Sequence, residues 1–217
     1  MEQIKEAYLL SLYFKALDLT NKSELCALIK KHLDKSAQEA ILPIPPDAPS
    51  EIPRIILNAA NPYKVHIEIM ANRINIRPDI NNSDLEGTIS LVVKILEEVQ
   101  ILPSRLALVH SFRFKADEKN PVKYISSNLL SSTSTFDEIE DVQLNYLQTV
   151  DIENTKYNMW TRHAQERISD SETYYFLEFD INSKANNESE FSIEDIKKHL
   201  LEADSLILNK KSEYESM

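Results

Sequence analysis

Four arginines in two predicted strands could give this chain a surface that binds anions. Arg73 and Arg77 alternate with apolar residues in one strand, and Arg105 and Arg113 do so in another. Because successive side chains point to opposite faces of a strand, all four are expected on the face away from the packed helices. A guanidinium group binds carboxylates and phosphates through paired hydrogen bonds. The set therefore predicts a site for a small anion or an acidic protein surface, with isolated solvated side chains as the alternative.

Trp160 and Arg162 form a second candidate, because they share one face of a strand predicted over residues 156–168. An aromatic ring beside an arginine is typical of interface hot spots. The competing interpretation, which the sequence favours, places Trp160 in the core. The candidate ligand-binding or partner-binding residues are therefore Arg73, Arg77, Arg105, Arg113, Trp160 and Arg162.

None of the five histidines has the spacing of a helical metal-binding motif. His66 and Glu68 share a strand face but would need a third ligand to bind a metal, so solvated side chains are expected there. His110 lies on an apolar strand face, where a satisfied core histidine is expected and a general base is the alternative. His163 and Glu166 are expected on opposite faces of their strand. We assign no catalytic residue, metal ligand or cofactor.

The glycine and cysteine counts exclude several chemistries. The single Gly87 rules out the glycine-rich loops of P-loop and dinucleotide-binding enzymes, and also the G-x-S-x-G nucleophile elbow. Cys26 is the only cysteine, which excludes an internal disulfide and any multi-cysteine zinc site. Its helical, apolar surroundings predict a buried and inert thiol.

Charge and hydropathy narrow the choice of partners. Lys and Arg number 24 and Asp and Glu number 35, so the formal net charge is −11. Nucleic-acid binding depends on cation–phosphate contacts, and this balance argues against it. The start of the chain lacks the pattern of a signal peptide, and no apolar run approaches the ~18 residues of a membrane span. We expect a cytoplasmic protein.

The elements that must position these residues follow from the apolar periodicity. The first half predicts a strand over 7–17, with a helix as the alternative, and then a helix capped by Ser23 and a proline-rich crossover over 41–53. Strands over 54–58, 64–70 and 73–77 follow, and a helix runs from the Ser83–Glu86 capping box to Pro103. The second half predicts a strand over 105–114, a short helix or loop over 122–130, a Ser/Thr-rich link over 131–135 and a solvated acidic run over 137–141. Strands over 141–152, 156–168 and 173–182 come next. A helix capped by Ser192 and a frayed tail over 211–217 end the predicted elements.

The two halves have a similar order of elements. Residues 7–100 read β-α-β-β-β-α, and residues 105–210 read β-(α)-β-β-β-α. The fold class is therefore α+β, with two such halves, 1–101 and 102–217, whose antiparallel sheets are covered by helices on one face. One continuous sheet is favoured over two separate small domains.

This order resembles the duplicated half-repeat of the TATA-binding protein and other helix-grip folds. The DNA-reading features of that family are absent, since the chain is acidic and lacks matching pairs of phenylalanine wedges. The strand over 74–77 with its following helix, the strand over 105–114 and the strand over 176–182 are also similar to a sporadically distributed family of uncharacterised bacterial α+β proteins. That resemblance implies a link to mobile elements or phage conflict.

The absence of catalytic motifs, the open sheet and the acidic surface predict a non-enzymatic protein-interaction module. It would present a sheet face or edge strand to a protein partner or to a second copy of the chain. The alternative is a small anionic ligand on the arginine-bearing face. A third hypothesis is an enzyme that uses His110 or His163.

Overall fold

The computed structural model describes residues 2–60, 64–78, 85–115, 125, 129, 142–152, 155–169, 172–184 and 189–216. The strands are β1 (Glu2–Tyr13), β2 (Gln38–Ile41), β3 (Ile55–Ala59), β4 (Val65–Ile69), β5 (Arg73–Pro78), β6 (Arg105–Lys115), β7 (Gln143–Ile152), β8 (Thr155–Ser169) and β9 (Glu172–Ser183). The helices are α1 (Lys22–Lys30), α2 (Leu85–Val99) and α4 (Ile193–Glu215).

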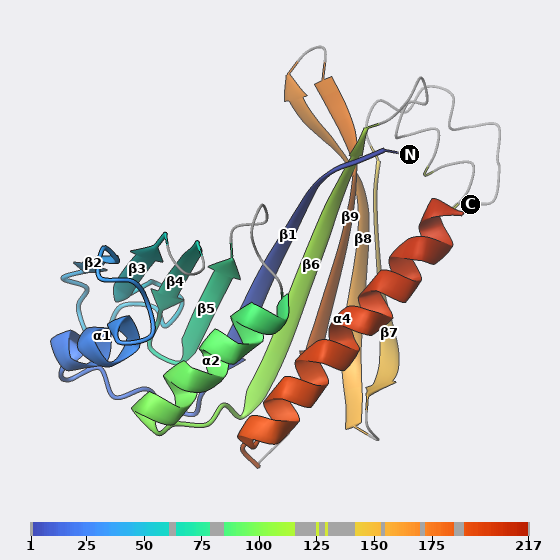
Figure 1. Cartoon of the computed structure of the whole chain (residues 1–217). Helices are drawn as coiled ribbons and strands as arrows, with labels where there is room; N and C mark the ends of the chain where they lie inside the picture. The colour runs from blue at the N-terminus through green and yellow to red at the C-terminus, as the bar shows by residue number, and fades with distance from the viewer. Residues whose placement is uncertain are drawn as a thin grey trace.

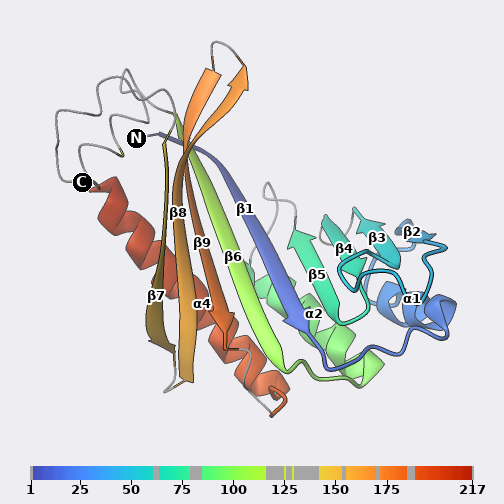
Figure 2. The ribbon, with the colours of Figure 1, turned by 180° about the vertical axis from the view of Figure 1, so that it is seen from behind.

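The nine strands form one antiparallel sheet in the order β2-β3-β4-β5-β1-β6-β9-β8-β7. All three helices lie along the same face of this sheet, which we call the helix face (Figure 1). The view from behind shows the opposite face, where none of the described helices lies over the strands (Figure 2). We call it the open face. The structure thus confirms an α+β fold with an antiparallel sheet, and the sheet is continuous.

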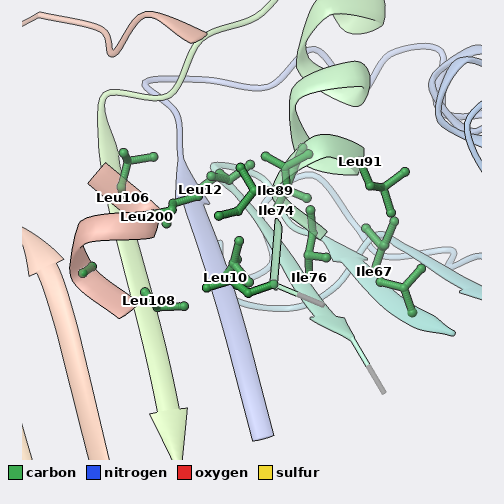
Figure 3. Close-up of a cluster of buried hydrophobic side chains, with 14 of the residues drawn as sticks. Leu10, Leu12, Ile67, Ile74, Ile76, Ile89, Leu91, Leu106, Leu108 and Leu200 are labelled. Atoms are coloured by element: carbon green, nitrogen blue, oxygen red, sulfur yellow. The ribbon is translucent and has the colours of Figure 1, made fainter. Parts of the chain in front are cut away.

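The core lies between the helices and the helix face. Figure 3 shows its centre, where apolar side chains of β1, β5 and β6 meet those of α2 and α4. The fully or almost fully buried members include Leu10, Leu12, Ile67, Ile74, Ile76, Ile89, Leu91, Leu106, Leu108 and Leu200. Burying each such side chain stabilises the fold by roughly 1.5–3 kcal/mol. Because apolar residues alternate along these strands, one face of the sheet is apolar and packs against the helices.

Several predicted elements have different bounds in the structure. β1 begins at Glu2, five residues earlier than expected, because its first residues pair with the far end of β6. α1 is capped by Asn21 and not by Ser23, since the Asn21 side chain accepts from the Glu24 backbone N–H. The short strand β2 was missed because its four residues are all exposed and lack an apolar alternation.

The C-terminal helix corrects another expectation. The capping box of α4 is present, with Ser192 and Asp195 bonded to each other's backbone. The helix then continues to Glu215, so the prediction that residues 211–217 fray is wrong. The ring of Tyr214 packs 4.8 Å from that of His163 and 6.1 Å from that of Phe179, and this contact holds the last turns on the sheet.

Four other predictions fall on parts of the chain outside the described residues. These are the Ser83–Glu86 capping box, most of the helix or loop over 122–130, the link over 131–135 and the acidic run over 137–141. Within the described part, Cys26 is 1% exposed, which confirms a buried cysteine, and burial raises the pKa of its thiol and so disfavours the reactive thiolate.

Candidate functional site

The open face carries every residue that the sequence proposed for binding. His110 and its alternate neighbours on β6 lie on the helix face, so Arg105 and Arg113 lie on the open face. Cross-strand pairing then places Arg73 beside Tyr13, and Trp160 and Arg162 opposite Asp180 and Glu178. The expectation that the four arginines point away from the helices is therefore right, and Trp160 and Arg162 lie on the same open face.

The structure divides the arginines into separate groups. At one end of the open face, the ring of Tyr13 lies between two guanidinium groups, 5.4 Å from that of Arg73 and 4.9 Å from that of Arg105. Arg105 also donates to Asn182 Oδ1 at 3.0 Å. We call this group the Tyr13 sandwich, in which cation–π contacts hold both arginines on the sheet.

A similar group lies eight residues further along β6. The Phe176 ring is 5.5 Å from the guanidinium of Arg113 and 5.4 Å from that of Arg162, and we call this group the Phe176 sandwich. Arg113 makes two hydrogen bonds to the carboxylate of Glu166, one of them 2.9 Å long. At about 3.3 Å per residue, the two sandwiches are roughly 26 Å apart, so they do not form one basic patch.

Arg77 forms a third group with β4. Its Nη1 lies 2.7 Å from Glu68 Oε2, and His66 lies 3.3 Å from the other carboxylate oxygen. His66 also contacts the Asn58 side chain at 2.7 Å. Among the described residues, no set of three histidine, cysteine, aspartate or glutamate side chains could hold a metal ion.

Trp160 lies in a part of the open face that differs from these paired groups. Its side chain is 45% exposed, and that of Leu147, directly opposite on β7, is 48% exposed. The interpretation that placed Trp160 in the core is therefore wrong. Trp160 lies on the open face of β8, which none of the described helices covers. Trp160 lines a depression of about 350 Å³ together with Asn145, Thr161, Arg162, Glu178 and Asp180.

Two carboxyl groups on β9 give this depression its charge. Burial raises the pKa of Glu178, and the like charge of Asp180 adds to this while Arg162 and Arg113 oppose it. Burial also raises the pKa of Asp180, whose Oδ1 accepts from Asn182 Nδ2 at 3.2 Å. Both carboxylates are thus partly removed from water without full compensation by a cation.

The helix face holds two buried polar centres beneath α4. His110 is 0% exposed, and its ring contacts Glu6 Oε1 at 2.6 Å and Asp204 Oδ1 at 3.1 Å. Each ring nitrogen of His110 thus faces one carboxyl oxygen, from β1 in one case and from α4 in the other. The hydrogen bond from His110, aided by those from Tyr8 and Gln3, lowers the pKa of Glu6 to about 2 against the effect of burial.

His163 lies in the other polar centre and is also 0% exposed. Its Nδ1 lies 2.6 Å from the Tyr175 hydroxyl, and its Nε2 lies 3.5 Å from that of Tyr146, which also bonds to the hydroxyl of Tyr214. Burial lowers the pKa of His163 to about 4, so the ring is neutral at pH 7. His163 thus contacts tyrosine hydroxyls, whereas His110 contacts carboxyl groups.

Both histidines join α4 to the sheet, through Asp204 in one case and Tyr214 in the other. With no exposed surface, neither ring can reach a substrate while α4 is docked. Their positions agree with the expectation of a satisfied core histidine at His110, and they extend it to His163.

Sequence reasoning missed the residues that complete these groups. Tyr13, Phe176, Glu178 and Asp180 were not proposed, although all of them alternate onto the open face of their strands. The alternation of residues along each strand predicts which face a side chain lies on. Which arginine packs on which aromatic ring depends instead on the strand order and the register of pairing. Those quantities join residues far apart in the sequence.

No protein-family model matches this chain, and no curated protein is significantly similar to it in sequence. Of the helices in the described part of the chain, none combines the length and the apolar character that crossing a membrane requires.

Proposed function

We propose that this protein is a non-enzymatic interaction module that binds a protein partner on the open face of its sheet, around Trp160. The observation that carries this proposal is the directly paired Trp160 and Leu147, both nearly half exposed beside a depression. Large exposed apolar side chains next to polar ones are typical of interaction sites, and tryptophan is enriched in hot spots.

The centre of the open face supports the same proposal. Across β1 and β6 its side chains are mostly small: Ala7, Leu9, Ser11, Ala107, Val109 and Ser111. Longer side chains, among them Trp160 and Arg162 on one flank and Arg77 on the other, border this strip. A partner segment is therefore expected to lie across this shallow strip and to make its main contact with the exposed Trp160 at the flank, since Ser11, Ala107 and Ser111 are themselves buried.

The small-anion alternative has weaker support. Arg77 and Arg113 already contact carboxylates, and Arg73 and Arg105 stack on Tyr13. An anion would have to compete with these internal partners at each position.

We also infer that the sheet consists of two halves joined along β1 and β6. From β1 outward the order is β5, β4, β3 and β2, and from β6 outward it is β9, β8 and β7. Each series is followed in the chain by a helix, α2 or α4. Fragments 1–101 and 102–217, expressed together, should reassemble with native-like circular dichroism; failure to reassemble would count against independent halves.

Affinity capture with the tagged full-length chain tests the proposed function. The captured protein is purified and titrated against the wild type and Trp160→Ala. A hot spot contributes about 2 kcal/mol or more, so the substitution should weaken binding about 30-fold. Leu201→Ala is the matched control, because Leu201 is 41% exposed on α4 at the other side of the molecule.

Three results would contradict the proposal. They are equal binding by Trp160→Ala and the wild type, loss of binding in Leu201→Ala alone, and a full-length chain that binds no protein and does not self-associate. Concentration-dependent sedimentation that is lost in Trp160→Ala identifies a second copy of the chain as the partner.

A further inference from the structure

The residues around Trp160 specify the chemistry of the partner. On β8 and β9, Trp160 lies directly opposite Asp180, and Arg162 lies directly opposite Glu178. On the other side, Leu147 and Asn145 of β7 lie opposite Trp160 and Arg162. The depression is thus bounded by the exposed indole of Trp160, by Arg162 and by two carboxylates, and the exposed Leu147 lies beside the indole.

Glu178 lacks a direct partner for its charge. No residue in the described part of the chain donates a hydrogen bond to its carboxylate or forms an ion pair with it. The charges of Arg162 and Arg113 favour its ionised form, but neither makes a direct ion pair with it: Arg162 lies over Phe176, and Arg113 contacts both Phe176 and Glu166. A partly buried carboxylate in this state is stabilised by an added cation.

Trp160 is suited to bind the same cation. A cation over an indole face gains roughly 0.5–2 kcal/mol, and tryptophan is the best of the aromatic rings for this contact. The aliphatic part of a lysine or arginine packs on apolar surface while its charged head reaches a polar group, and Leu147 provides such surface. A volume of about 350 Å³ lies at the small end of ligand pockets and suits a single long side chain.

We propose that the partner is a protein segment bearing an exposed lysine or arginine, whose charged head binds between Trp160 and the carboxylates of Glu178 and Asp180. This inference rests on the proposed interaction at the open face and adds the chemistry of its partner. The net charge of −11 draws basic segments toward the chain, and the depression holds one basic side chain in place. Arg162, held on Phe176, forms the end of the depression toward Arg113.

Trp160 also provides the measurement, because it is the only tryptophan of the chain and its fluorescence reports on this site alone. The probe is acetyl-tetraarginine amide, titrated into the full-length protein at 150 mM salt. A saturable change in tryptophan fluorescence is expected. The double variant Glu178→Gln/Asp180→Asn should bind the peptide at least tenfold more weakly.

The control variant removes two negative charges from a part of the surface outside the depression. Glu97 and Glu194 are exposed on α2 and α4, and Glu97→Gln/Glu194→Gln should bind the peptide like the wild type. Equal weakening in both double variants would show attraction to the net charge only, and would overturn the proposal. So would the absence of a fluorescence change in the wild type, or equal binding of acetyl-tetraglutamate amide.

The captured partner separates this inference from the proposed function. If its binding is lost in Trp160→Ala but kept in Glu178→Gln/Asp180→Asn, the open face binds a partner without a basic anchor, and only the inference fails. If neither variant affects binding, the proposed function fails as well. Loss of binding in both variants, with retention in Glu97→Gln/Glu194→Gln, supports both.

Discussion

The two faces of the sheet are made by the same strands but differ in burial and in what their polar groups contact. On β6, Phe112 and His110 of the helix face are completely buried, whereas the alternating Arg113 and Val109 of the open face are not. Polar groups of the helix face, such as His110 and His163, contact α4 and serve folding. Those of the open face mostly pair with neighbouring strands, but at the depression beside Trp160 the carboxylate of Glu178 receives no hydrogen bond from the described residues. Substitutions should therefore separate into folding effects and binding effects according to the face.

The largest expected effect is in the helix-face core. Phe112 is 0% exposed and packs on His110, Phe114 and Phe179. Phe112→Ala should lower the free energy of unfolding by about 3–5 kcal/mol, because it leaves a cavity that the surroundings fill only in part. Urea denaturation followed by circular dichroism measures this. Val109→Ala, on the open side of the same strand, should cost less than half as much; equal costs would erase the distinction between the faces.

The second effect is the pH dependence that His163 creates. Its pKa is lowered from 6.5 to about 4 in the folded state, so between these values the unfolded chain binds more protons. Stability should fall on acidification from pH 6.5 to 4, by about 3 kcal/mol since one pKa unit corresponds to ~1.36 kcal/mol. His163→Gln should flatten the stability profile in this window. A profile that stays equally steep would assign the dependence to other groups.

The third effect concerns the carboxylate at His110, in a lower pH window. Glu6 has its pKa lowered from 4.5 to about 2, so its contribution is present above pH 4.5 and is lost as the pH falls toward 2. Glu6→Gln should reduce the free energy of unfolding at pH 7 by about 2 kcal/mol, a typical value for hydrogen bonds to charged groups. Thermal denaturation at pH 7 and pH 2 tests this, because the variant and wild type should differ less at pH 2. A constant difference would speak against a role for the ionised Glu6 carboxylate.

The smallest effect on folding is expected at the proposed binding site. Trp160→Ala should change the free energy of unfolding by less than about 0.5 kcal/mol, as most exposed substitutions do, while it weakens partner binding about 30-fold. Chemical denaturation must be followed by circular dichroism, since the substitution removes the only tryptophan. A loss of several kcal/mol would mean that the indole supports the fold and would weaken the contrast between the faces.

Local patterns were sufficient for most of the fold. The alternation of Val65, Ile67 and Ile69 predicted β4, and the Ser192 cap predicted the start of α4. β2 could not be predicted, because its pairing with β3 stabilises it and its own residues carry no apolar period. The extension of α4 was missed for a similar reason, since Tyr214 is held by His163 from a distant strand.

The candidate site was predictable only as a face. Alternation placed Arg73 and Arg113 on the uncovered side, but it could not show that the arginines stack on Tyr13 and Phe176. Alternation also did not decide whether Trp160 lies in the core or on the uncovered face, because a tryptophan is compatible with either face until the position of the helices is known. Glu178 became a candidate only when the register placed it opposite Arg162.

The central position of β1 has a consequence for the order in which the molecule assembles. Ser11 of β1 bonds to Asn75 of β5 across 64 residues, and Glu6 bonds to His110 of β6 across 104 residues. During translation β1 therefore leaves the ribosome well before either neighbour exists, whereas β3, β4 and β5 can pair soon after synthesis. Such non-local pairing slows folding and leaves apolar segments exposed in the meantime. The apolar stretch around Leu10 and Leu12 therefore stays without its strand partners in the nascent chain until β5 and β6 have been made.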